Sequence, residues 1–117
     1  MRRAFPVLVG AVAIAVVVAP VPARTDGVEE KRLLENDRVA VYEYVFPGGF
    51  RGEEHAAVAD EFAYVIDGEF TVVTRGRGTQ VVRRGEVEYA SKGTIHTSLN
   101  ESKKPARVLV VLLKGRQ

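Results

Sequence analysis

Short apolar stretches rich in β-branched and aromatic residues alternate with glycine-containing turns along most of the chain. Residues 39–46 read Val-Ala-Val-Tyr-Glu-Tyr-Val-Phe, a composition typical of strands, and Pro47-Gly48-Gly49 ends them. Further expected strands are 62–66, 70–74, 79–83, 86–89, 95–100 and 107–113. Short strands with turns about every eight to twelve residues predict an antiparallel barrel or sandwich. No helix of three turns is expected after residue 23.

The stretch before the first strand, residues 24–38, is polar and weakly periodic, and it is interpreted as a lead-in segment. Within it, residues 28–34 are compatible with one helical turn or with an edge strand. Asn36-Asp37 marks a turn before the first confident strand. The barrel domain is therefore expected to span residues 39–117, as a single domain.

Residues 1–23 differ in character from the rest. Arg2 and Arg3 precede an almost wholly apolar run at 4–19, and small residues follow up to Ala23. This order predicts a secretory signal peptide cleaved after Ala23, and hence a periplasmic or secreted bacterial protein with no membrane association after cleavage. The alternative is an uncleaved membrane anchor, for which the apolar run is slightly short. The chain has no cysteine, which excludes a lipoprotein anchor and disulfides.

Charge gives no reason to expect a nucleic-acid partner. The chain holds 17 basic and 15 acidic residues, and removal of Arg2 and Arg3 with the signal leaves 15 of each. The alkaline isoelectric point of about 9.1 therefore belongs to the precursor. A formally neutral domain is not expected to bind nucleic acid or acidic membranes.

Candidate chemistry gathers around the only two histidines, His55 and His96, and around Glu61. Each lies next to an expected strand, which suggests a metal site inside a small β-barrel. Two imidazoles and one carboxylate with open positions form the facial triad typical of non-haem iron(II), and manganese, nickel, copper or zinc would also bind. Glu53 would share a face with His55 if residues 53–55 are extended. It is a candidate extra ligand or catalytic base, or, with Glu54, part of a solvated acidic corner.

The same residues lie in two motifs that resemble those of a small single-domain cupin. The first motif is Gly49, five residues, His55-Ala56-Ala57, three residues, Glu61, six residues and Gly68. The second is Gly85, five residues, Ser91-Lys92-Gly93, two residues, His96, three residues and Asn100. This resemblance, over residues 49–100, implies an all-β, double-stranded β-helix (jelly-roll) fold.

The chain departs from the cupin motifs at two positions. Ser91 replaces a proline, which costs some turn rigidity. Ala57 replaces a second histidine, and cupins of this kind usually hold a divalent metal with three histidines and one glutamate. The resemblance thus implies His55, Glu61 and His96 as metal ligands. Asn100, Thr94 and Ser98 are the nearest candidates to orient the imidazoles.

The leading hypothesis is an exported cupin that binds a divalent metal and a small molecule; if it is an enzyme, the dioxygenase and isomerase types are the expected ones. Two alternatives remain: a metal-free cupin with an apolar or sugar-type pocket, and a non-catalytic interaction module that dimerises through an exposed sheet. A homodimer is left open in each case. Six aromatic residues are expected in the core or on a dimer face rather than around a ligand: Tyr42, Tyr44, Phe46, Phe62, Tyr64 and Phe70.

Overall fold

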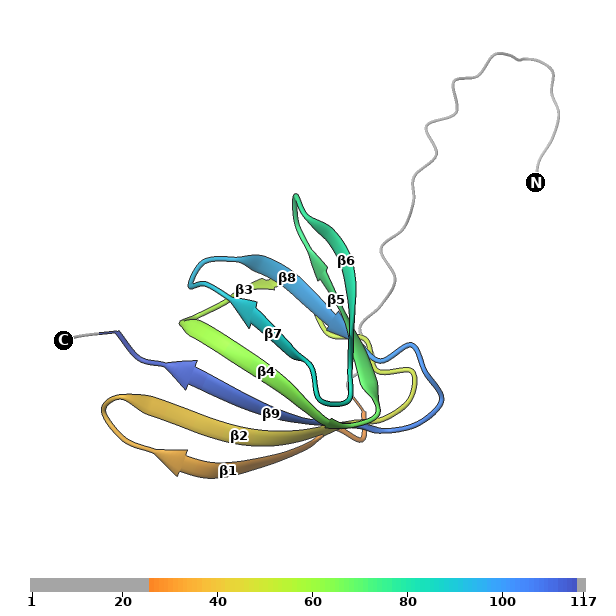
Figure 1. The fold of residues 1–117 in the computed structure, drawn as a ribbon, viewed down its shortest axis with the longest axis horizontal. Helices are drawn as coiled ribbons and strands as arrows, with labels where there is room; N and C mark the ends of the chain where they lie inside the picture. The colour runs from red at the N-terminus through yellow and green to blue at the C-terminus, as the bar shows by residue number, and fades with distance from the viewer. Residues whose placement is uncertain (1–25, 116–117) are drawn as a thin grey trace, which may run out of the picture.

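Two antiparallel sheets make up the part of the chain that the computed structural model describes, residues 26–115 (Figure 1). The five-stranded sheet has the order β1-β2-β9-β4-β7 and the four-stranded sheet the order β3-β8-β5-β6. The strands are β1 (Glu29–Glu35), β2 (Val39–Phe46), β3 (His55–Ala56), β4 (Asp60–Asp67), β5 (Glu69–Thr74), β6 (Gly78–Arg83), β7 (Val87–Ala90), β8 (Ile95–Leu99) and β9 (Ala106–Leu113). This confirms the predicted all-β architecture. The predicted signal peptide lies outside the described residues, and within 26–115 no helix is long and apolar enough to cross a membrane.

The expected strands agree with the observed ones to within about two residues, and 39–46 coincides with β2. The open alternative at 28–34 is resolved as an edge strand, β1, which pairs with β2. Every residue of β1 is exposed, and most are charged. Charged side chains on an edge strand discourage pairing with strands of other molecules.

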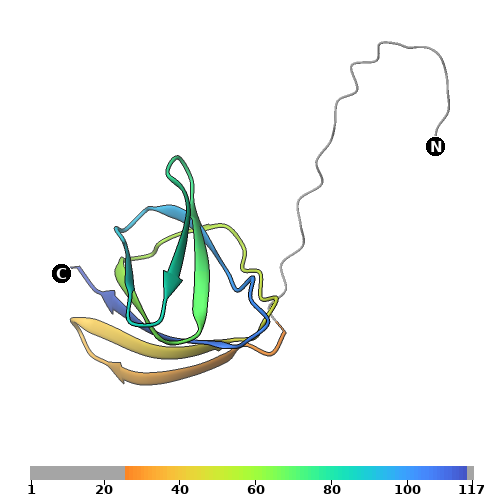
Figure 2. The ribbon, with the colours of Figure 1, turned by 45° about the vertical axis from the view of Figure 1, so that its right-hand side comes forward.

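The two sheets face each other and curve into a barrel (Figure 2). Its hydrophobic core is made by inward-facing residues of β4, β5, β6 and β9, namely Ala63, Val65, Phe70, Val72, Val82, Ala106 and Val108. Phe46 and Val110 pack against this cluster while remaining partly accessible. The core therefore fills one end of the barrel, and the strand segments beyond it are free to line a cavity.

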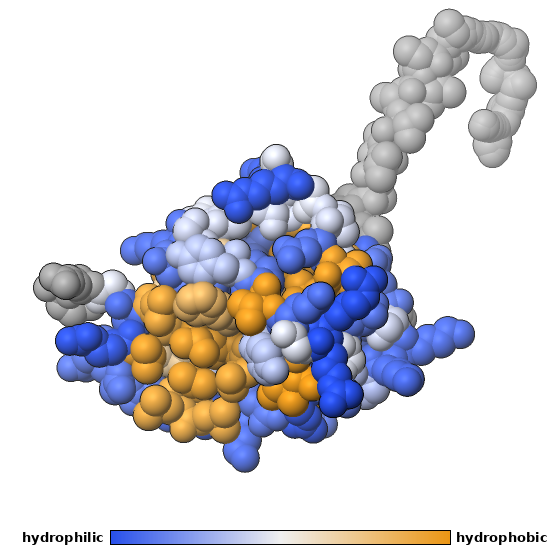
Figure 3. Space-filling view, viewed as in Figure 1, coloured by the Kyte–Doolittle hydropathy of each residue, from blue (hydrophilic) through white to orange (hydrophobic). Residues whose placement is uncertain are grey.

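On β4 and β7 the aromatic side chains point outward. Phe62 and Tyr64 on β4, and Tyr89 on β7, are exposed, and the rings of Phe62 and Tyr89 contact each other across the strands at a centroid distance of 5.2 Å. Hydrophobic residues also gather on the surface seen in Figure 3. Because side chains alternate along a strand, the inward positions are held by Glu61, Ala63 and Val65 on β4 and by Glu88 and Ala90 on β7.

The turns depend on glycine where the sequence predicted it. Gly49, Gly68, Gly85 and Gly93 all adopt positive φ, between 80° and 88°. Gly68 is constrained further, because a Cβ there would come within 2.5 Å of the Pro105 carbonyl oxygen. Only glycine lets the β4–β5 turn approach the segment before β9 so closely.

Candidate metal centre and ligand cavity

The two histidines are direct neighbours in the four-stranded sheet. β3 pairs with β8 so that His55 lies opposite His96, and the ring centroids are 4.7 Å apart in an edge-to-face arrangement. Residues opposite each other on paired strands project from the same face of the sheet. The structure therefore brings His55 and His96 together, as the sequence predicted.

The imidazole of His96 is buried without a hydrogen bond. Its side chain is 2 % exposed, and neither Nδ1 nor Nε2 has a hydrogen-bonding partner among the described residues. Nε2 lies 3.9 Å from Oε2 of Glu61, and Nδ1 lies 3.9 Å from Oε2 of Glu88. Both distances are too long for a hydrogen bond. Because an unsatisfied buried polar atom is costly, this arrangement fits a site completed by a cation.

Glu61, Glu88 and His96 form a cluster in which one ligand atom of each residue lies within 4.8 Å of the others. Glu61 comes from β4 and Glu88 from its neighbour β7, where Glu61 pairs with Ala90 and Glu88 pairs with Ala63. His96 comes from β8, in the other sheet. The cluster thus spans the interior between the two sheets. Oxygen and imidazole ligands in this number are suited to a divalent transition metal.

Burial shifts the pKa of each member of the cluster toward its uncharged form. Desolvation, with a smaller contribution from the charge of Glu61, raises the pKa of Glu88 to about 7. Desolvation also raises the pKa of Glu61, an effect that the nearby His55 opposes. Burial, and then His55, lower the pKa of His96. A bound cation would reverse the shifts of the two carboxyl groups, because it stabilises carboxylates, and would reinforce the neutral form of His96.

His55 is held with one nitrogen directed at the backbone. Its Nδ1 lies 2.9 Å from the carbonyl oxygen of Glu53, and because a carbonyl only accepts, Nδ1 carries the proton. The lone pair then belongs to Nε2, the arrangement usual for a metal-binding histidine whose other nitrogen donates to a carbonyl. The ring is exposed and lines the cavity described below. It adjoins the cluster without being one of its three members, so its role as a ligand stays a prediction.

The expected orienting residues do not contact the buried imidazole. Asn100 is fully buried, but its amide donates to the carbonyls of Phe46 and Lys104 and accepts from Ser102. The Thr94 hydroxyl pairs with that of Ser91. Since both nitrogens of His96 lack partners, the expectation that Asn100, Thr94 or Ser98 orients this ring is wrong. Asn100 instead fixes the loop between β8 and β9.

Sequence reasoning missed Glu88. Residues 86–89 read Glu-Val-Glu-Tyr, and simple alternation favours Val87 and Tyr89 as the buried pair. The structure reverses this assignment, with Glu88 6 % exposed and Tyr89 50 % exposed. The available signal was Ala90, a small residue two places from Glu88 and within the second motif, which is compatible with an interior face at both positions.

A cavity of about 550 Å³ opens beside the cluster. It is lined by Tyr42, Tyr44, Phe46, Phe50, Gly52, Glu53, His55, Val58, Glu61, Ser98, Val110 and Leu112. Tyr42, Tyr44 and Phe46, which were expected in the core or on a dimer face, all line this cavity, and Phe46 also packs against the core. Phe70 does belong to the core, and Phe62 and Tyr64 lie on the outer face.

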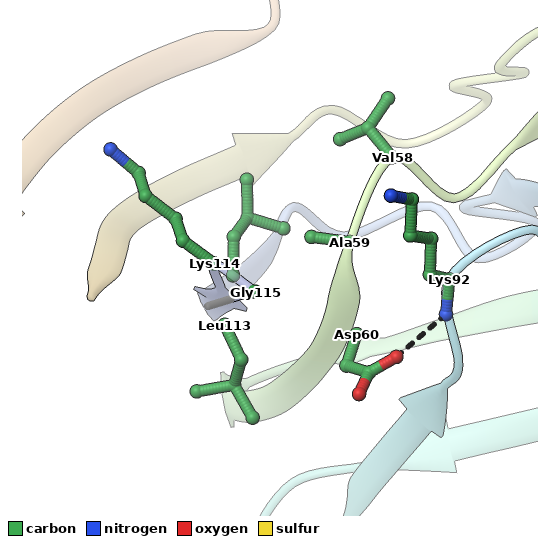
Figure 4. A pocket seen from close by; sticks show the side chains of 8 residues that line it. Val58, Ala59, Asp60, Lys92, Leu113, Lys114 and Gly115 are labelled. Carbon is green, nitrogen blue, oxygen red and sulfur yellow. Dashed lines mark hydrogen bonds between the residues drawn. The ribbon is translucent and has the colours of Figure 1, made fainter. Parts of the chain in front are cut away.

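A smaller hollow of about 360 Å³ lies next to this cavity and shares Val58 and Leu112 with it. Figure 4 shows it between the end of β9 and the loop before β8, where the backbone N–H of Lys92 donates to Asp60. None of the three members of the cluster lines it. Glu61 is the member of the cluster that lines the larger cavity, so we place the candidate site there.

Comparison with known families gives one match, to the family described as the cupin domain, over residues 41–112. The chain is a cupin. Solved structures agree on the fold. A cupin superfamily protein from Desulfitobacterium hafniense has a TM-score of 0.69 and 19% identity, over 81% of this chain and 84% of that one. A cupin with a double-stranded β-helix from Methanocaldococcus jannaschii has a TM-score of 0.70 and 17% identity, over 84% and 93%.

The DMSP lyase DddQ from Ruegeria pomeroyi is also similar, with a TM-score of 0.69 and 19% identity, over 77% of this chain and 48% of that one. At such identities these likenesses show the cupin fold and no more. A comparison with curated proteins finds no match.

Proposed function

We propose that this cupin binds one divalent metal ion through Glu61, Glu88 and His96, with His55 as a fourth donor, and that it presents the ion to a small molecule in the cavity. The observation that carries the proposal is the buried imidazole of His96. Both of its nitrogens lack a hydrogen bond, and each faces a carboxylate oxygen at 3.9 Å. A cation bound by one of these nitrogens and by the carboxylates would remove the cost of leaving that nitrogen unpaired, and the other nitrogen, as N–H, would have the remaining carboxylate oxygen as its nearest acceptor.

The donor set explains how a cupin can bind metal without the histidine that Ala57 replaces. Ala57 is buried and offers no ligand atom. Glu88 reaches the cluster from β7, a strand outside the first motif, and would supply the ligand atom that the replaced histidine would otherwise give. Two carboxylates and two imidazoles suit iron, manganese, zinc, nickel or copper.

When bound, the metal would supply Lewis acidity to an oxygen-bearing ligand in the cavity. The chain's own groups then have distinct roles. The Glu53 carbonyl holds His55 in one tautomer, with Nε2 unprotonated. Glu53, which lines the cavity, is the candidate for proton transfer to or from a bound molecule. The predicted signal peptide would place this chemistry in the periplasm or outside the cell.

The test is the metal content of protein purified without a histidine tag, measured for the wild type and four variants. One equivalent of metal is expected in the wild type, and only traces are expected in His96→Ala and Glu61→Gln. Glu88→Gln should bind metal at least about tenfold more weakly, because a ligand or its hydrogen-bonding partner is changed. Glu86→Gln, an exposed residue of the same hairpin, is the matched control and should keep full occupancy.

Circular dichroism and size-exclusion chromatography would show that each variant keeps its strands and its size. Equal trace metal in the wild type and in folded His96→Ala would defeat the proposal. That result would leave the metal-free binding cupin as the better interpretation.

A further inference from the structure

The side chains that line the cavity indicate the class of ligand that it can hold, which the metal cluster alone does not. We propose that the cavity takes an apolar, ring-containing molecule with a single oxygen-bearing head group, the head lying at the end formed by His55 and Glu61. This deepens the proposed function and rests on it, because the head group is the part that would meet the metal.

The apolar wall is an aromatic ladder made by Tyr42, Tyr44, Phe46 and Phe50. Successive ring centroids are 5.9, 5.5 and 4.6 Å apart, so the four rings form one continuous surface. Three of them alternate along β2 and therefore project from the same face of that strand. Tyr42, Tyr44 and Phe46 are half-buried, and an apolar molecule that covers their remaining accessible surface gains free energy. Phe50 is itself buried and supports the end of the ladder.

The neighbouring strand continues the apolar wall. β9 pairs with β2 in a register that places Val110 opposite Tyr42 and Leu112 opposite Ala40. Val110 and Leu112 both line the cavity. The side of the cavity formed by the five-stranded sheet is thus apolar until β4, where Glu61 pairs with Leu112 and introduces a carboxylate.

The polar groups are few, and each of them is acidic, imidazole or hydroxyl. Glu53, His55, Glu61 and Ser98 are the polar lining residues apart from the two tyrosines, and within residues 26–115 no lysine or arginine lines this cavity. A phosphate or a molecule with several carboxylates would therefore meet no countercharge beyond that of the metal. A sugar would leave most of its hydroxyls against rings and aliphatic groups. These contacts favour a single head group.

The size of the cavity is consistent with such a ligand. About 550 Å³ falls within the range usual for small-molecule sites, and it accommodates a substituted aromatic ring. Its mostly apolar lining and its few polar groups match a molecule with one apolar end and one polar end.

Two hydroxamic acids test the inference on the zinc-loaded protein. Benzohydroxamic acid and acetohydroxamic acid share the same metal-binding head, and only the first carries a ring. Isothermal calorimetry should show benzohydroxamic acid binding at least about tenfold more tightly. Tyr44→Ala, which interrupts the ladder, should reduce this preference to about threefold or less. Tyr64→Ala removes a tyrosine from the outer face and should leave the preference unchanged.

The outcomes separate the two proposals. If zinc binds and the two hydroxamates bind equally, the ligand class is wrong and the metal site stands. If Tyr64→Ala reduces the preference as much as Tyr44→Ala, the ring binds elsewhere and the inference is overturned. If zinc does not bind to the wild type, the proposed function fails and this inference fails with it. Thermal melts of the metal-free variants establish that each one is folded.

Discussion

At the scale of single residues, Glu88 has the most unusual environment in the barrel. Its carboxyl group is buried between β7 and the imidazole of His96, and no described group donates a hydrogen bond to it. Removing a carboxylate from water favours the neutral acid, which raises its pKa to about 7. In the metal-free protein, ionisation of Glu88 above this pH should therefore lower the free energy of unfolding.

Stability measurements on Glu88→Gln test this environment. A raised pKa means that the contribution of Glu88 is fully present below about 4.5 and is lost as the pH rises through about 7. Relative to the wild type, the free energy of unfolding of metal-free Glu88→Gln should therefore increase between pH 4.5 and pH 8. The increase should be at most about 3 kcal/mol. Urea titrations in the presence of EDTA would measure it.

The lowered pKa of His96 has the opposite sign, since the stability that it brings is lost as the pH falls below its unfolded value of about 6.5. Both proteins contain His96, so its effect largely cancels in the difference. If the wild type and Glu88→Gln show parallel stability profiles over this range, the carboxyl group of Glu88 is better solvated than the structure indicates.

At the scale of the elements, the turns set the register of the barrel, and Gly68 is the most constrained of them. Gly68 and Gly76 have nearly the same φ, 80° and 83°. A Cβ at Gly76 would meet nothing within 4 Å, whereas one at Gly68 would collide with the Pro105 carbonyl. Substitutions at these two glycines therefore separate two contributions to stability: the cost of a left-handed backbone and the cost of close contact.

Gly76→Ala should lower the free energy of unfolding by about 1 kcal/mol, the cost of the left-handed conformation. Gly68→Ala should lower it by about 3 kcal/mol or more, because the β4–β5 turn must also move away from β9. Chemical denaturation of the two variants would measure the difference. Equal losses would show that the approach to Pro105 relaxes without cost.

The elements also show what the sequence could and could not predict. Strand positions followed from glycine turns and β-branched runs, so β2, β5 and β9 were predicted within one residue of their observed bounds. Glu61 and His96, which lie in the cluster, were predicted from the motif spacing, whereas the role of His55 as a ligand stays a prediction. The direction of β7 was not predictable from alternation, because Val87 and Tyr89 lie outside while Glu88 lies inside. Alternation fixes which residues share a face, and tertiary pairing decides which face is buried.

At the scale of the whole molecule, the candidate metal centre joins the two sheets. Glu61 and Glu88 belong to the five-stranded sheet, and His96 belongs to the four-stranded sheet. An ion held by all three would hold the sheets together at the end of the barrel away from the core. Metal binding should therefore stabilise the entire fold and not only a loop.

Zinc at about 100 times its dissociation constant should raise the free energy of unfolding by about 2.7 kcal/mol. For a domain of this size, that corresponds to an increase in melting temperature of roughly 10 °C or more. Differential scanning calorimetry would measure it, with Glu86→Gln responding like the wild type and Glu61→Gln responding little. A zinc-dependent increase that survives in Glu61→Gln would place the ion elsewhere.

Whether two copies associate stays a prediction at this scale. The outward aromatic residues of β4 and β7 supply an apolar surface, as the dimer-face expectation for Phe62 and Tyr64 requires.

Along β9 and β4, core residues and cavity-lining residues occupy successive inward positions of the same strand. On β9, Ala106 and Val108 lie in the core, while Val110 and Leu112 face the cavity. On β4, which runs antiparallel to β9, the cavity position of Glu61 comes first and the core positions Ala63 and Val65 follow. Substitutions at the open end can thus accumulate while the packed end continues to specify the fold. Such a division gives the protein engineer apolar cavity positions, such as Val110 and Leu112, that can be varied to change the ligand while the core and the proposed metal ligands are kept.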